Sequence, residues 1–237
     1  MRDELAAERD ARRLHHRVPW PTWTRLDPAA IARVAMHVEV QRGDKPAGLD
    51  VGAIGGGWPA IDYGDVRHLA ALGMGLRATR DQLAQDVDAL VAAGGKRAGF
   101  QGVVPGLLEE VGLALGVIGG GRPRPVYLVG GFGGFSRALA EAIGRGGELT
   151  LDGLYERFPR ARDVWAAARE LVPGAARPLR DPAEVYAAWA AWLDGASWSK
   201  LDNGLTDAEN EELAETIDVD RVVELVVRGL RAVRGAP

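Results

Sequence analysis

The chain has 237 residues, 47% of them hydrophobic, and a formal net charge of −4. This length and apolar content suffice for one large domain or two small ones with a buried core. The mixed, mildly acidic charge argues against nucleic acid as a partner. Because the chain has no cysteine, the sequence excludes disulfides, zinc–thiolate sites, iron–sulfur clusters and thiol nucleophiles.

No apolar run approaches the roughly 18–20 residues that are needed to span a bilayer. The first 16 residues are charged and contain no apolar core of a secretion signal. We therefore expect a cytoplasmic protein with no membrane partner.

The first 28 residues are expected to form an N-terminal arm, followed by one continuous domain over residues 29–237. Within the arm, residues 1–17 are predicted to be a polar helix or disordered, and residues 18–28 irregular. Asp27 is a predicted N-cap with Pro28 at the first helical position, so residues 29–43 should open as a helix. Residues 44–65 are rich in glycine and proline and predict a loop. Leucines at helical spacing then predict a helix over residues 66–85.

The middle of the chain repeats one order of elements: strand, glycine loop, helix. Residues 87–92 are a short apolar run, typical of a strand that is buried on both faces, and residues 107–117 form an apolar helical pattern. Residues 126–131 predict a second buried strand, again followed by glycines and a helix. Such βαβα units require parallel strands, whose carboxyl ends hold the ligands of open sheets. The fold expected is thus α/β and Rossmann-like, with flanking helices and a mostly helical part over residues 147–237.

The two glycine loops are the strongest candidates for a ligand site. Glycine lets a ligand approach the backbone, and a helix N-terminus offers free N–H groups to an anion. The second loop, GGFGGFS from Gly130 to Ser136, matches neither standard nucleotide fingerprint, and a purely structural turn is about as well supported. The first loop is more specific, because Lys96 offers a charge to a phosphate and Gln101 a hydrogen bond to a base or ribose.

Two adjacent carboxylates, Glu109 and Glu110, follow this first loop at the start of a helix. One of them is explained by the preference of carboxylates for helix N-termini. Adjacent residues point in different directions, so only one is expected to face a cleft, where it would bind ribose hydroxyls or support glycosidic cleavage. Arg77 and Arg80 lie on the helix before the first strand and have a modest chance of reaching the site. The histidines show no metal-ligand spacing, and neither a metal nor a cofactor is expected.

Three segments together resemble the SLOG superfamily, in family order: ALVAAGGKRAGFQGVVPGLLEEVGLAL, RPVYLVGGFGGFSRAL and LDNGLTDAENEELAETIDVDRVVELVVRGL. The variant most similar to them accompanies TIR and SIR2 domains in bacterial immunity, as in Thoeris sensors. The resemblance implies a Rossmann-like domain that binds a nucleotide-derived ligand, such as a cyclic ADP-ribose isomer or another NAD-derived signal. It also implies a sensor in antiphage defence that acts through oligomerisation or a TIR or SIR2 effector.

Carried over residue by residue, the resemblance places ligand contacts on both glycine loops. The residues it implies are Arg80, Gly94, Gly95, Lys96, Gln101, Gly102, Pro105, Gly106, Glu109, Glu110, Gly130, Gly131, Phe132, Gly133 and Gly134. The related LOG enzymes carry a P-G-G-x-G-T-x-x-E loop for cleaving nucleoside monophosphates. The loop GFQGVVPGLLEE lacks its threonine and its spacing, which favours binding over hydrolysis.

The chain departs from the family at its N-terminus, where members usually begin with a strand and its own glycine loop. That strand and loop are expected to be missing here, because the segment MRDELAAERDARRLHH is too polar for a buried strand. Either the chain starts too late, or it is degenerate, or a partner completes the sheet. An uncovered edge favours a homo-oligomer. Two alternatives to a sensor remain: a LOG-like phosphoribohydrolase that uses Glu109 or Glu110, and a structural or interaction protein whose cleft has decayed.

Overall fold

The computed structural model describes residues 14–20, 22, 27–35, 38–49, 62–97, 100, 104–146, 149, 160–173 and 178–235. It confirms an α/β, Rossmann-like fold with parallel strands and a helical C-terminal part. In chain order the elements are β1 (Leu14–Val18), α2 (Pro28–Ala35), β2 (Val38–Arg42), α3 (Val66–Asp86), β3 (Leu90–Gly94), α4 (Gly106–Ala114), β4 (Val126–Gly133), α5 (Gly134–Arg145), α7 (Arg160–Leu171), α8 (Pro182–Leu193), the 3-10 helix η3 (Trp198–Leu201), α9 (Asp207–Glu215) and α10 (Val219–Arg234).

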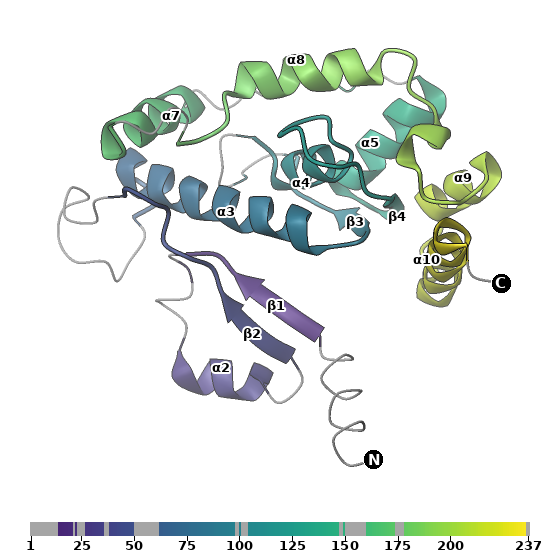
Figure 1. Ribbon diagram of the computed structural model, residues 1–237, viewed down its shortest axis with the longest axis horizontal. Coiled ribbons are helices and arrows are strands. Elements are labelled where there is room, and N and C mark those ends of the chain that lie inside the picture. Colours follow the sequence, from purple (N-terminus) through teal and green to yellow (C-terminus); the bar gives the residue numbers. More distant parts are fainter. Residues whose placement is uncertain are drawn as a thin grey trace.

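The N-terminal part differs from the prediction. Residues 14–18 form strand β1, which pairs in parallel with β2, so the expectation of an N-terminus without a strand is wrong for these residues. The predicted helix over residues 29–43 ends at Ala35, and the chain continues as β2 from Val38. Asp27 does cap α2, since its Oδ1 accepts from the amide of Ala29 at 3.0 Å. The sequence did not predict β1 because the residues of this strand are mostly polar. The strand belongs to a small sheet beside α3 (Figure 1).

The second parallel pair, β3–β4, carries the glycine loops. Leu90 pairs with Val126 and Ala93 with Val129, so the described strands form two two-stranded sheets where the sequence predicts one open sheet. Strand β4 is buried on both faces from Val126 to Gly130, as expected, and becomes exposed at Phe132. Strand β3 is not: Ala92 is buried, but Val91 is 49% exposed. The prediction was wrong for β3 because an apolar run in the sequence does not show how far the neighbouring helices extend over the strand.

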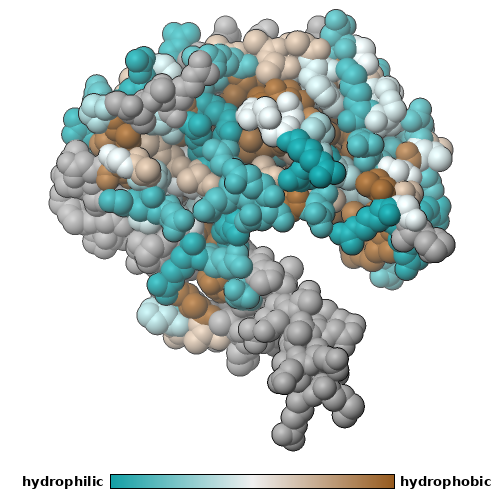
Figure 2. All heavy atoms as spheres, viewed as in Figure 1, coloured by the Kyte–Doolittle hydropathy of each residue, from teal (hydrophilic) through white to brown (hydrophobic). Residues whose placement is uncertain are grey.

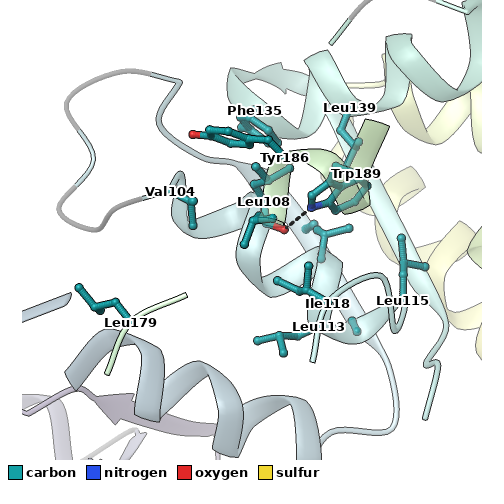
Figure 3. Close-up of a cluster of buried hydrophobic side chains, with 14 of the residues drawn as sticks. Val104, Leu108, Leu113, Leu115, Ile118, Phe135, Leu139, Leu179, Tyr186 and Trp189 are labelled. Atoms are coloured by element: carbon teal, nitrogen blue, oxygen red, sulfur yellow. Dashed lines mark hydrogen bonds between the residues drawn. The ribbon is translucent and has the colours of Figure 1, made fainter. Parts of the chain in front are cut away.

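A large hydrophobic core fixes the helices that follow the strands (Figure 3). Leu108 on α4 packs with Phe135 on α5 and with Trp189 on α8. The Trp189 indole donates to the carbonyl of Leu108 at 3.2 Å, and the ring is wholly buried. The tryptophan on α8 is therefore a core residue, and this contact holds the N-terminal turn of α4 in place beside the β3 loop.

The C-terminal helices α9 and α10 cover the other face of β4, where they bury Tyr127 and Val129 (Figure 1). The Tyr127 hydroxyl donates to the carbonyl of Asn203 at 2.9 Å, and burial raises the Tyr127 pKa from 10.0 to about 12. Helix α9 begins with the predicted capping box of Thr206 and Glu209. No helix in the described ranges is both long and apolar enough to cross a membrane.

Candidate functional site

The loops after β3 and β4 meet at the carboxyl ends of the two strands. Gly94 and Gly134 form a parallel bridge, and the amide of Phe135 donates to the carbonyl of Gly95 at 3.0 Å. A Cβ on Gly134 would lie 2.6 Å from the backbone of Gly94. Glycine is therefore required where the two loops touch, and the start of α5 is fixed against the end of β3.

Two glycines of these loops have no atom packed against the position of a side chain. Gly94 and Gly133 have φ values of 68° and 77°, in the left-handed region that favours glycine. A Cβ built on either would meet nothing within 4 Å. Their backbones are accessible to a ligand on the same edge of the strands. Phe132, the neighbour of Gly133, is 52% exposed and presents an aromatic ring at this edge.

Two helix N-termini without side-chain caps and a positive charge lie at the same edge. Helices α4 and α5 begin here, and their N-caps, Pro105 and Gly133, make no side-chain capping bond. Lys96 is exposed, and its ammonium makes no hydrogen bond or ion pair with any described residue. Uncapped helix N-termini beside a lysine suit an anionic group such as a phosphate. Ser136, in contrast, is fully buried and donates to the carbonyl of Val129 at 2.8 Å, so its hydroxyl is already used.

The predicted carboxylates have different environments. Glu109 is 4% exposed, and its two oxygens accept from Arg80 Nη1 and Arg180 Nη1, each at 2.7 Å. Glu110 has a side chain that is 36% exposed, and its Oε1 accepts from Arg80 Nε at 3.1 Å. Of the two carboxylates, only that of Glu110 is partly exposed; that one of the pair faces a ligand cleft stays a prediction. Glu109 is held by two guanidinium groups inside the fold.

Arg180 ties this cluster to the segment before α8. Its Nη2 also donates to Asp81 Oδ1 at 2.5 Å. Burial by itself would lower the Arg180 pKa, but the hydrogen bond to Asp81 and the charges of Glu109 and Asp81 raise it above its ordinary value. Arg180 lies 71 residues from Glu109, and no local pattern in the sequence could have identified it. We call Arg80, Asp81, Glu109, Glu110 and Arg180 the Arg–Glu cluster.

The structure brings only some of the predicted site residues together. Gly94, Gly95, Lys96, Gly133 and Gly134 come together at the strand ends. Arg80 covers Gly106, because a Cβ there would lie 2.5 Å from Arg80 Nη2, and both adjoin Glu110. Gln101 and Gly102 lie outside the described residues.

Gly130 and Gly131 have a packing role. A Cβ on Gly130 would lie 2.4 Å from the carbonyl oxygen of Ala214, and one on Gly131 would almost overlap that of Thr216. The end of α9 thus lies directly on β4 at these two positions. Their need for glycine is explained by this close approach of two backbones.

A cavity of about 610 Å³ opens elsewhere, between α3, α8 and the loop before β4. Arg77, Arg122, Arg124 and Arg180 contribute to its lining. Three of these four side chains are engaged. Arg77 forms an ion pair with Asp81 at 3.4 Å, Arg124 donates to the carbonyls of Val87, Arg122 and Gln85, and Arg180 belongs to the Arg–Glu cluster. We place the candidate ligand site at the glycine loops, because the open backbones of Gly94 and Gly133 and the unpaired Lys96 lie together there, rather than in this cavity.

Parallel strands whose carboxyl ends turn through glycines into helices define a Rossmann-like α/β domain of the nucleotide-related type. The family model described as SLOG cluster2 matches residues 2–213. The chain belongs to the SLOG superfamily. No curated protein and no solved structure matches it.

Proposed function

We propose that this chain binds a phosphate-bearing, nucleotide-derived ligand at the carboxyl ends of β3 and β4. The observation that carries the proposal is the pair of open, left-handed glycines, Gly94 and Gly133, beside the unpaired ammonium of Lys96. Backbone amides and a lysine bind phosphate oxygens, and the exposed ring of Phe132 suits stacking on a base. Membership of the SLOG superfamily supports the same ligand class.

The finer proposal is a cytoplasmic sensor in bacterial antiphage defence. Its ligand would be an NAD-derived signal, for example a cyclic ADP-ribose isomer, and its output would pass to a TIR or SIR2 effector. The three SLOG-like segments support this assignment. The test is a thermal-shift panel of AMP, CMP, NAD, ADP-ribose and cyclic ADP-ribose isomers. We expect a shift with one or more NAD-derived compounds, and no shift with any of them would favour a structural or interaction protein.

A LOG-like phosphoribohydrolase is the second candidate, and one observation favours it. The half-buried carboxylate of Glu110 lies beside Gly106 at the start of α4 and is oriented by Arg80. An accessible carboxylate of this kind suits support of an oxocarbenium-like transition state. Incubation with AMP, CMP and NAD, followed by product analysis, distinguishes the phosphoribohydrolase from the sensor. Release of a free base that disappears in Glu110→Ala would establish the enzyme and contradict a pure sensor.

A further inference from the structure

Helix α10 carries more apolar surface than the protein buries. One side of the helix, which includes Leu225 and Gly229, packs on Tyr127 of β4. A second row of side chains lies further round the helix and stays exposed. It comprises Val219 (61% exposed), Val223 (55%), Val227 (38%) and Val233 (43%). In Figure 2, hydrophobic atoms lie among hydrophilic ones over α10, at the lower right of the molecule.

A further exposed apolar side chain lies on the sheet face beside α10. Val91 of β3 pairs directly with Tyr127 and so lies on the face that α10 covers, yet it is 49% exposed. On its opposite flank α10 is joined to α9 by the ion pairs of Arg221 with Glu212 and of Arg228 with Glu209. The valine row therefore faces away from α9 and towards the uncovered part of β3. We call Val91, Val219, Val223, Val227 and Val233 the α10–β3 surface.

The charges are unevenly divided along α10. The N-cap Asp218, Asp220 and Glu224 lie at its N-terminal end or in its first half, and Arg228, Arg231 and Arg234 in its second half. The first half also contains Arg221, which is paired with Glu212 of α9 and with Glu224. An antiparallel copy of the same helix, related by a two-fold axis near residue 226, would bring Asp220 of each copy to Arg231 of the other. The same axis would bring Val223 to Leu230 and Val219 to Val233. The apolar row and the side chains of Asp220 and Arg231, which form no ion pair with a described residue, are thus self-complementary, which is the requirement for an isologous contact.

We propose that the α10–β3 surface binds a second copy of this chain, through an antiparallel contact between the two α10 helices. The chain's own N-terminal elements lie elsewhere: in Figure 1, β1 and β2 lie below α3, and α2 lies beyond β2. Arg17 at the end of β1 forms an ion pair with Asp86 of α3 at 2.8 Å, and Val18 and Trp20 are buried. Asp220 and Arg231 are exposed and form no ion pair with any described residue, so both are available to a partner.

The test is the mass of the full chain in solution, measured by sedimentation velocity over a range of micromolar concentrations. We expect a dimer for the wild type. Val223→Asp should weaken the dimer by at least about 30-fold, because it places two charges in the apolar contact. Asp220→Arg and Arg231→Asp should each weaken it by about 10-fold, since each turns two symmetry-related attractions into repulsions. The double reversal, Asp220→Arg with Arg231→Asp, should restore wild-type association.

The matched control is Glu211→Arg on α9, which also reverses an exposed carboxylate and should leave the dimer unchanged. A purely monomeric wild type would overturn the proposal, as would a dimer that persists in Val223→Asp and in both single reversals. Failure of the double reversal to rescue would overturn the antiparallel α10 contact. The charge variants keep the test valid if Val223→Asp does not fold, because the side chains of Asp220 and Arg231 make no hydrogen bond or ion pair with any described residue. These measurements of the dimer do not depend on the proposed ligand.

Discussion

Replacing Glu109 with glutamine should destabilise the fold far more than the same change at Glu110. Glu109 is 4% exposed and accepts from both Arg80 and Arg180 at 2.7 Å. Removing one partner of a buried ion pair costs about 3–5 kcal/mol. Here Arg80 keeps Glu110 and Arg180 keeps Asp81, so we expect about 2–3 kcal/mol for Glu109→Gln. Glu110 has a side chain that is 36% exposed and makes one contact, at 3.1 Å, so Glu110→Gln should cost about 0–1 kcal/mol.

Urea unfolding followed by tryptophan fluorescence measures both values, because the chain has 7 tryptophans. The denaturant dependence of the unfolding free energy should stay constant between variants, so that the shift in midpoint reports stability alone. Equal losses for the two variants would refute the assignment of Glu109 to the fold and of Glu110 to the accessible edge. So would a loss for Glu109→Gln below about 0.5 kcal/mol, the range of an ordinary surface change.

Three further changes test the packing. Gly131→Ala forces a Cβ against the carbonyl of Thr216 and should cost about 3 kcal/mol or more in urea unfolding. Its control, Gly121→Ala, meets nothing within 4 Å and should stay within about 1 kcal/mol of wild type. Burial raises the Tyr127 pKa to about 12, so the neutral phenol stabilises the fold fully below pH 10 and progressively less up to pH 12. Wild type should lose about 2–3 kcal/mol more over this range than Tyr127→Phe, as measured by unfolding at each pH. Thr206→Ala removes the capping box of α9 and should lower stability by about 1 kcal/mol; no change in melting temperature would contradict that cap.

Local patterns predicted α3 and the capping box of α9 well, although the helix expected over residues 29–43 ends at Ala35. The helix expected over residues 66–85 is α3, Val66–Asp86, and the Thr206–Glu209 capping box is present as predicted. These features depend on side chains within one or two turns of each other. The strand beginning at Val126 was also correct, because a continuous apolar run between glycine and proline turns is typical of a buried strand.

Contacts between distant segments could not be predicted in the same way. Arg180 reaches Glu109 across 71 residues, and the pattern around Arg180 gives no sign of a buried ion. Strand β1 was not predicted because its residues do not alternate between apolar and polar, as those of a half-buried strand do. The glycine loops were located correctly, but only the structure separates Gly94 and Gly133, which are open, from Gly131, which α9 covers.

The most direct test of the ligand site is isothermal titration of wild type, Lys96→Ala and Arg122→Ala with the NAD-derived compound that gives the largest thermal shift. Lys96 lies at the glycine loops, whereas Arg122 is an exposed cation at the separate cavity. We predict that Lys96→Ala weakens binding by about 10-fold or more, on the scale of 1–3 kcal/mol for a charged hydrogen bond, without loss of folding stability. Arg122→Ala should bind as wild type does. Unchanged affinity in Lys96→Ala, with a loss in Arg122→Ala, would contradict the account and move the site to the cavity.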